Sequence, residues 1–297
     1  PAKAVGNNKT GNRLALARWM TRSDHPLTSR VWVNRVWKHH FGRGIVSSLD
    51  NFGTQGAAPT HPGLLDWLSV ELVENKWSTK HLHHLICTSR AYRQSSAKTK
   101  LVASKDSDNV LLSRMPMRRL DAEELHDGLL AIAGRLNMRM GGEPDEVQVF
   151  GRGYVTGKPG DEGWRRSVYI RQRRIHTMTL LETFDLPTMN PNCVERVNST
   201  VVQQPLYLLH DKVIYGLARQ LASQIQKETK GIEPSIRLAY QKIVNRPPSK
   251  KELASMIESV GELERQFVEA KETGQRNKAL AAVCHALFNS AAFLYVD

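Results

Sequence analysis

The chain has 297 residues, of which 42 are Lys or Arg and 29 are Asp or Glu, so its formal net charge is +13. Apolar residues make up 40% and charged residues 24%, a composition that excludes collagen-like, disordered and low-complexity chains. The positive charge favours polyanionic partners such as phosphates, sulfated glycans or anionic lipid, but it identifies no reaction. The length fits one large domain or two closely packed ones.

Three cysteines, at positions 87, 193 and 284, are too few for a disulfide scaffold. The chain has no C-x-x-C-H string that would attach a c-type haem and no C-x-x-C pair that would bind zinc. We therefore predict that this chain binds no haem, no metal and no other cofactor.

The two terminal segments bear on how the protein is targeted. Residues 1–13 contain neither Met nor an apolar run, which indicates a piece of a longer protein. The stretch 279–296 lacks Asp, Glu, Lys and Arg, but its apolar residues recur at helical spacing. We expect this stretch to be a docked amphipathic helix, and we expect no transmembrane segment.

The N-terminal part of the chain has the periodicity of a series of helices. Between the second and the third, residues 42–59 form a connector whose glycines permit backbone conformations closed to other residues, so it is a candidate functional loop. Asp121 and Glu124 have the spacing of a capping box at the start of the fifth helix. The expected helices span 12–21, 28–41, 62–74, 79–89 and 121 to about 141.

Between 146 and 175 the spacing of apolar residues changes from 3.6 to 2, which predicts a small antiparallel β hairpin. In a strand over 165–174, alternation would place Tyr169, Arg171 and Arg173 on one face and the apolar residues on the other. Further helices are expected over 177–184, 205–226, 233–244, 250–270 and 276–289.

These elements predict a mainly α fold with a small antiparallel β hairpin. We expect a main helical domain over residues 1–230, with its β element near 146–175. A C-terminal three-helix subdomain over residues 231–297 is expected to pack on it. The sequence has no internal repeat, which excludes solenoids and propellers.

Several strings in the sequence carry a resemblance to a known family. In the first third they are NRVWKHHFGRG from Asn34, DNFG from Asp50, PTHPGLLDWL from Pro59 and TSRAYRQS from Thr88. Later strings agree in the same order, among them RRSVY from Arg165, FDLP from Phe184 and NRPP from Asn245. Over nearly its whole length the chain resembles the C-terminal domain of large planctomycete secreted proteins, the domain of unknown function 1553.

This resemblance implies a periplasmic or extracellular setting. It also implies, upstream in the same polypeptide, a second domain of unknown function and often a c-type cytochrome domain. It implies no established catalytic residues. One departure is His210, where the family usually has Asn in a Leu-Leu-Asn string.

His40 is the first candidate for chemistry, because it shares an apolar helix face with Trp37. The simplest interpretation is a hydrogen-bonded core histidine. The alternative is that His40 joins Asp50, His61 and Asp66 in an acid/base or metal cluster. His81 and His84 have a spacing that can hold a metal, but the Glu of an H-E-x-x-H site is missing, so we predict no metal there.

A second candidate is the polar loop that contains Asn190, Cys193 and Arg196. A thiolate beside an arginine has a lowered pKa and can act as a nucleophile, provided that a base is near. The alternative is a packed or disulfide-bonded structural cysteine.

The arginine-rich stretch 165–174 is the strongest signal for binding, since its five arginines meet no acid within it. Guanidinium groups suit sulfate, phosphate or carboxylate, and Tyr169 would offer its ring to a sugar beside Arg171 and Arg173. The alternative is an edge strand that its charges protect against aggregation.

Three functions follow from these features. The first is a binding or scaffolding module that engages anionic polysaccharide or a partner domain. The second is a hydrolytic or redox enzyme whose site is formed by the 42–61 and 190–200 loops. The third, nucleic-acid binding, is disfavoured because only the charge supports it and no nucleic-acid-binding motif is present.

Overall fold

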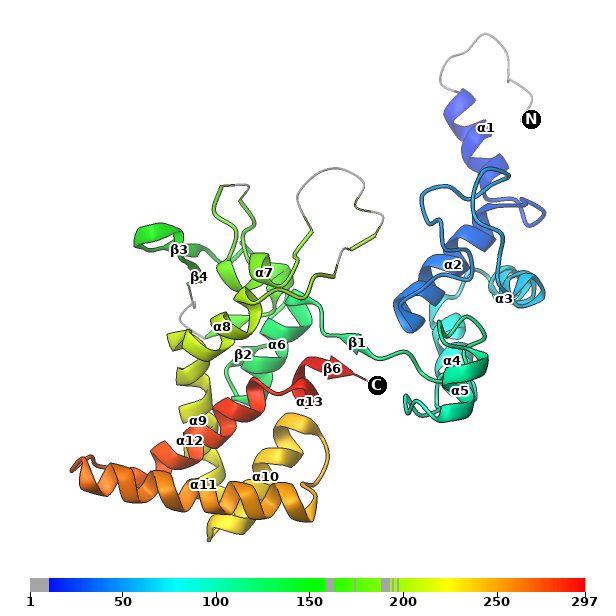
Figure 1. Cartoon of the computed structure of the whole chain (residues 1–297). Coiled ribbons are helices and arrows are strands. Elements are labelled where there is room, and N and C mark those ends of the chain that lie inside the picture. The colour runs from blue at the N-terminus through cyan, green and yellow to red at the C-terminus, as the bar shows by residue number, and fades with distance from the viewer. Residues whose placement is uncertain are drawn as a thin grey trace. The chain divides into compact units, whose positions relative to one another are not determined.

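The computed structural model describes residues 11–158, 163–173, 175–187, 193, 195, 196 and 198–296 (Figure 1). The fold is mainly α with short paired strands, as the sequence predicts. The chain divides into two compact units, Pro1–Arg118 and Arg119–Val296, and each is described by itself. Among the residues described, none of the helices combines the length and the apolar character that crossing a membrane requires.

The first unit is built on α2, which packs against α3 and α4. Val33, Trp37 and Phe41 of α2 are buried, with the rings of Trp37 and Phe41 stacked 4.2 Å apart. They share a core with the apolar faces of α3 and α4. The helices are α1 (Gly11–Met20), α2 (Thr28–Phe41), α3 (Pro62–Glu74), α4 (Thr79–Thr88) and α5 (Lys100–Lys105).

Asn34 joins α2 to the start of the glycine-rich connector. Its side chain is buried, with Nδ2 donating to the carbonyl of Val46 and Oδ1 accepting from the Val46 N–H, both at 2.9 Å. The chain reverses through Gly42, whose φ of 74° is left-handed and closes α2. A Cβ on Gly44 would lie 2.5 Å from the Val46 carbonyl oxygen, so this close approach requires glycine. The first part of the connector therefore has a structural role.

We predict that Asn34→Ala lowers the free energy of unfolding by about 2–3 kcal/mol, because it leaves the N–H and the carbonyl of Val46 buried without partners. Urea denaturation followed by circular dichroism measures the change. The control is Asn51→Ala, an exposed asparagine in the same connector, which should lie within about 0.5 kcal/mol of the unchanged protein. Equal stability of the two variants would contradict the role given to Asn34.

The second unit has one continuous apolar core. Helix α9 packs along α12, and the small residues Ala218, Ala222 and Ala279 in this interface are fully buried. The boundary expected near residue 230 lies inside this core, which extends from α6 to α13. The helices are α6 (Ala122–Ile132), α7 (Thr179–Thr183), α8 (Gln203–His210), α9 (Lys212–Glu228), α10 (Ile232–Val244), α11 (Lys250–Glu269), α12 (Gln275–Phe288) and α13 (Ala291–Leu294).

Within the described part of the chain, the strands form three pairs. An antiparallel pair joins β3 (Val147–Val149) to β4 (Val155–Gly157) through a 3-10 turn, η1 (Gly151–Gly153). This hairpin lies in the predicted region 146–175, but its second strand is 155–157. A parallel pair joins β2 (Leu136–Asn137) to β5 (Trp164–Arg165). The third pair is β1 (Arg118–Arg119) with β6 (Tyr295–Val296).

The long strand predicted over 165–174 is wrong. Strand β5 ends at Arg165, and the chain then turns through a 3-10 segment, η2 (Ser167–Tyr169), which leaves Val168 73% exposed. The cause is a pair of contacts distant in sequence. Arg165 is buried, with its Nε donating to Asp145 at 2.8 Å, and the N–H of Ser167 donates to Asp127 at 2.7 Å. These bonds hold the chain in a turn, so the alternating side-chain pattern of a strand does not form.

Candidate functional site

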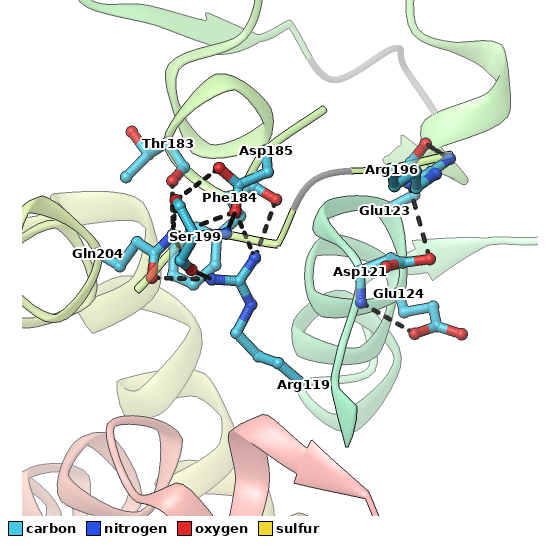
Figure 2. A network of polar contacts seen from close by, with 10 residues as sticks. All are labelled: Arg119, Asp121, Glu123, Glu124, Thr183, Phe184, Asp185, Arg196, Ser199 and Gln204. Carbon is cyan, nitrogen blue, oxygen red and sulfur yellow. Dashed lines mark hydrogen bonds and ion pairs between the residues drawn. The ribbon is translucent and has the colours of Figure 1, made fainter. Parts of the chain in front are cut away.

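A buried arginine organises the polar part of the second unit (Figure 2). The Arg119 side chain is 7% exposed, and its guanidinium donates to Asp185 at 2.7 Å, to Gln204 Oε1 at 2.8 Å and to the carbonyl of Ser199. It also lies over the ring of Phe184, 5.4 Å from the ring centre. These contacts compensate a charge that would otherwise be costly to bury.

Asp185 is the anionic partner in this network. Its carboxylate accepts from the hydroxyl of Ser199 at 2.6 Å and from the Ser199 N–H at 2.8 Å, as well as from Arg119. Burial by itself would raise the pKa of Asp185, but the hydrogen bonds from Ser199 and Arg119 outweigh it and lower that pKa. The backbone of Asp185 has a left-handed φ of 66°, a conformation that Asp tolerates better than most residues.

The network closes the base of the 186–198 loop. Asp185 stands before this loop and Ser199 after it, and the two are bonded directly. Gln204 at the start of α8 adds a bond from Nε2 to the carbonyl of Thr183 at 3.1 Å. The FDLP string and Ser199 therefore lie at one structural junction.

We predict that Arg119→Met lowers the free energy of unfolding by about 3 kcal/mol, because Asp185 keeps its charge after losing its cation. Chemical denaturation at neutral pH measures this. The control is Arg237→Met, which removes an exposed arginine that pairs with Glu233 on the surface of α10 and should cost less than about 1 kcal/mol.

The lowered pKa of Asp185 also predicts a pH dependence. A carboxyl with a lower pKa in the folded than in the unfolded state stabilises the fold above its unfolded pKa, near 4. This stabilisation is lost as the pH falls through the folded pKa. We expect unfolding curves measured from pH 6 downwards to show a shallower loss of stability for Asp185→Asn than for the unchanged protein. Parallel curves would contradict the assignment.

The N-terminal end of α6 presents carboxylates beside this junction. The predicted capping box is confirmed, with Glu124 Oε2 accepting from the Asp121 N–H at 3.0 Å. Arg196 donates to both oxygens of Glu123, at 2.6 and 2.8 Å, and its Nη1 lies 3.7 Å from Asp121 Oδ2 (Figure 2). The hydrogen bonds from Arg196 lower the pKa of Glu123.

These groups line a pocket of about 450 Å³ in the second unit. Four carboxylates and three arginines face it over an apolar floor, a volume and a composition that suit a small polar ligand. The lining consists of Asp121, Glu123, Glu124, Asp127, Arg166, Ser167, Val168, Ile170, Arg171, Gln172, Thr177, Met178, Leu181, Leu186 and Arg196. We call it the α6 pocket.

Ser167, His126 and Asp127 meet in the wall of the α6 pocket. The Ser167 hydroxyl donates to Asp127 at 2.7 Å and lies 3.0 Å from His126 Nδ1, which is itself 3.2 Å from Asp127. In a catalytic triad the serine and the aspartate contact opposite nitrogens of the imidazole. Here both face Nδ1, and Nε2 is buried without a partner among the residues described. The arrangement holds η2 in place and lacks triad geometry.

Four of the predicted candidates lie in the first unit, and three of them have separate partners. His40 Nε2 is 2.7 Å from His83 Nδ1, His61 Nδ1 is 2.9 Å from the Thr60 hydroxyl, and Asp66 accepts from Arg30 at 2.7 Å. Asp50 is exposed. Burial and the nearby His83 and His39 lower the pKa of His40, as in a hydrogen-bonded, largely neutral imidazole. Within the described part of the chain, no three His, Cys, Asp or Glu side chains could together hold a metal ion.

The predicted loop candidates are only partly described. Asn190 lies outside the described residues. Cys193 is exposed, with its Sγ 3.4 Å from the carbonyl oxygen of Glu195. Cys87, Cys193 and Cys284 are free thiols in the structure, so Cys193 is neither packed nor disulfide-bonded. Arg196 is the member of this group that reaches the α6 pocket.

The three predicted ligand-binding residues separate in space. Arg171 lines the α6 pocket, whereas Tyr169 and Arg173 do not. The stretch 165–174 contains no acid, but in the fold Glu146 lies 2.6 Å from Arg171 and 3.2 Å from Arg173. Tyr169 lies beneath the Arg165 guanidinium, 4.7 Å from its ring centre.

Sequence reasoning missed Arg119, Asp127 and Ser167 as site residues. Arg119 precedes the capping box by two residues, and Asp127 follows Glu123 by one helical turn. This spacing shows that the acids share a helix face, but it does not show which arginines meet them. Their partners come from segments about 40 and 70 residues away.

The fold and the site define a mainly α protein with a charged pocket at the start of α6. Residues 12–260 match the family described as Protein of unknown function (DUF1553), also named PSD1, and the chain belongs to this family. No curated protein and no solved structure matches the chain.

Proposed function

We propose that this protein is a binding module for an acidic polysaccharide and that the α6 pocket holds one or two sugar units. The observation that carries the proposal is the mixed lining of the pocket, where carboxylates and guanidinium groups surround an open volume above apolar side chains. The net charge of +13 supports a polyanionic partner.

The carboxylates of the pocket suit sugar hydroxyls because each has an internal partner that fixes its position. Glu123 is held by Arg196, and Asp127 by the hydroxyl and the N–H of Ser167. A carboxylate oxygen has lone pairs for more than one hydrogen bond, so these groups can still accept from a ligand hydroxyl. Met178 and Leu181 provide apolar surface for the carbon atoms of a sugar ring.

The arginines of the pocket give it a preference for an acidic ligand. Arg166 is 54% and Arg171 is 36% exposed at the side chain, so both guanidinium groups can reach a ligand. Arg171 shares Glu146 with Arg173, and Arg166 is 3.5 Å from Asp127. Such exposed ion pairs contribute about 0–1 kcal/mol, so a uronate or a sulfate can replace the acid at low cost.

Binding is favoured over acid-catalysed hydrolysis by the state of the carboxyl groups. A general acid in glycoside hydrolysis needs a raised pKa to stay protonated at neutral pH. The pKa of Glu123 is lowered by Arg196. The pKa of Asp127 is lowered by hydrogen bonds from His126 and Ser167, which outweigh the effect of burial. Both groups are therefore ionised acceptors.

The family resemblance also bears on the cellular location of this module and on the polypeptide that contains it. We propose that it acts in the periplasm or outside the cell of a planctomycete, in a polypeptide that also carries a cytochrome c domain. We also propose that this chain itself contributes no cofactor.

The test is calorimetric titration with an oligogalacturonate at low salt. We predict that Arg171→Gln weakens binding about three- to fivefold, as expected for a partly exposed ion pair. Binding should fall steeply towards 1 M salt, because the Debye length then shortens to about 3 Å. A sulfated oligosaccharide in a parallel titration shows whether sulfate replaces the uronate.

Arg173→Gln is the matched control, because it removes the same charge two residues away and the same partner, Glu146, but lies outside the pocket. It should change binding less than twofold. Equal loss in both variants, or equal affinity for a neutral oligosaccharide, would show that the attraction is not specific to the pocket.

A further inference from the structure

We infer that the second unit has another ligand site, independent of the α6 pocket, that takes a small aromatic carboxylate. The site is a pocket of about 580 Å³ between the β3–β4 hairpin and the start of α9, and we call it the hairpin pocket. Figure 1 shows the hairpin beside α8, which leads into α9. The inference goes beyond the proposed polysaccharide binding and uses none of its residues. The lining consists of Phe150, Gly151, Tyr154, Thr156, Thr179, Tyr207, His210, Asp211, Lys212 and Val213.

The walls of the hairpin pocket are aromatic. Phe150 is 45% exposed, although water contact is unfavourable for so large an apolar ring. Its ring centre lies 5.8 Å from that of Tyr154, with the planes tilted by 41°. Such a tilted pair leaves ring faces available, and aromatic rings prefer tilted or offset neighbours at this distance. Tyr207 adds a third ring to the lining.

Asp211, an acid in the lining of the pocket, already accepts three hydrogen bonds. It caps α9, with Oδ1 accepting from the N–H groups of Val213 and Ile214 at 2.9 and 3.0 Å. Its Oδ2 accepts from the Tyr154 hydroxyl at 2.6 Å. One lone pair of Oδ2 is left on a buried side chain, so Asp211 offers a ligand at most one acceptor position.

Two further polar groups of the pocket, Thr179 and Lys212, can donate to a ligand. Burial and Asp211 raise the pKa of Tyr154 to about 12, but its single hydroxyl proton is donated to Asp211, so Tyr154 has none for a ligand. The Thr179 hydroxyl accepts from the Val155 N–H at 2.8 Å and keeps its own proton for donation. A ligand of the hairpin pocket must therefore carry hydrogen-bond acceptors.

The charge beside the pocket is positive. Lys212 and His210 are exposed and line it, and neither has an acidic partner among the residues that the structure describes. A lysine in the first turn of a helix is disfavoured by the helix dipole, whereas an anion there would be favoured. Asp211 already caps the helix end, so a carboxylate on the ligand would serve as the counter-charge of Lys212.

The aromatic surface of the pocket, its hydrogen-bond donors and Lys212, which is unpaired among the residues described, together favour a ligand that has a flat apolar ring and an anionic group. A sugar fits less well, because it needs several acceptors for its hydroxyls, and Asp211, the one carboxylate among the described lining residues, already accepts three hydrogen bonds. The volume has room for one substituted ring. The α6 pocket, with its many carboxylates and arginines, has the opposite character.

The experiment is titration of the whole chain with 4-hydroxybenzoate, followed by calorimetry and ligand-observed NMR. Its methyl ester, which has the same ring and no charge, is the comparison ligand. We expect the acid to bind at least fivefold more tightly than the ester. Phe150→Ala should weaken binding of the acid about tenfold through loss of the ring contact, and the thermal unfolding of this variant shows whether it folds.

Lys212→Gln should weaken binding of the acid three- to fivefold and leave binding of the ester unchanged. Lys227→Gln is its matched control, since it removes the same charge from an exposed site at the far end of α9 and should bind the acid normally. Three results would overturn the inference: no binding of the acid at about 10 mM, equal binding of acid and ester, or equal losses in the two lysine variants. None of these results bears on oligogalacturonate binding, so the two proposals fail separately.

Discussion

The second unit depends on the burial of one positive charge. A guanidinium group removed from water needs acceptors for its donors, and the two terminal nitrogens of Arg119 find them on three separate segments of the chain, while Nε is buried without a partner among the residues described. Because these acceptors are a carboxylate, a side-chain amide and a backbone carbonyl, the segments that carry them have little freedom to shift. A single side chain thus sets the mutual position of α6, α7 and the start of α8.

The α6 pocket follows from this constraint. Arg119 lies two residues before the cap of α6, so fixing the guanidinium also fixes the carboxylates at that helix end. Ser199, on the far side of the junction, follows Arg196 by three residues and places it opposite Glu123. The charges that face a ligand are therefore supported by a second layer of polar contacts, which is how preorganised binding sites are held.

Most helices of this protein were readable from the sequence because their signals are local. Among the exceptions are α5, which was not predicted, the helix expected to reach about 141, which ends at Ile132, and the helix expected over 205–226, which Asp211 divides into α8 and α9. The capping boxes of α6 and α11 and the apolar periodicity of α9 need no knowledge of distant segments. Their packing was not readable. The core that joins residues on both sides of position 230 arises from contacts between α9 and α12, about 60 residues apart.

The candidate site was predicted in part, and the stretch 165–174 explains the limit. Alternating residues suggested a strand, but Asp127 and Asp145 capture Ser167 and Arg165 and turn the chain. No residue within 165–174 indicates that Asp127 and Asp145 are the partners. Arg171 was identified as part of the arginine-rich stretch and Arg196 as the neighbour of Cys193, whereas the role of Arg119 was overlooked because a buried charge is recognisable only when its acceptors are known.

The bond between Asp185 and Ser199 has a consequence for how this family can diversify. The bond joins the two residues that flank the segment 186–198, so it does not depend on the length of that segment. The entropy of closing a loop grows only with the logarithm of its length, at about 0.6 kcal/mol for each doubling. Insertions between these two residues that leave Leu186 and Arg196 in place are therefore inexpensive, and the junction can carry segments of different length beside the α6 pocket.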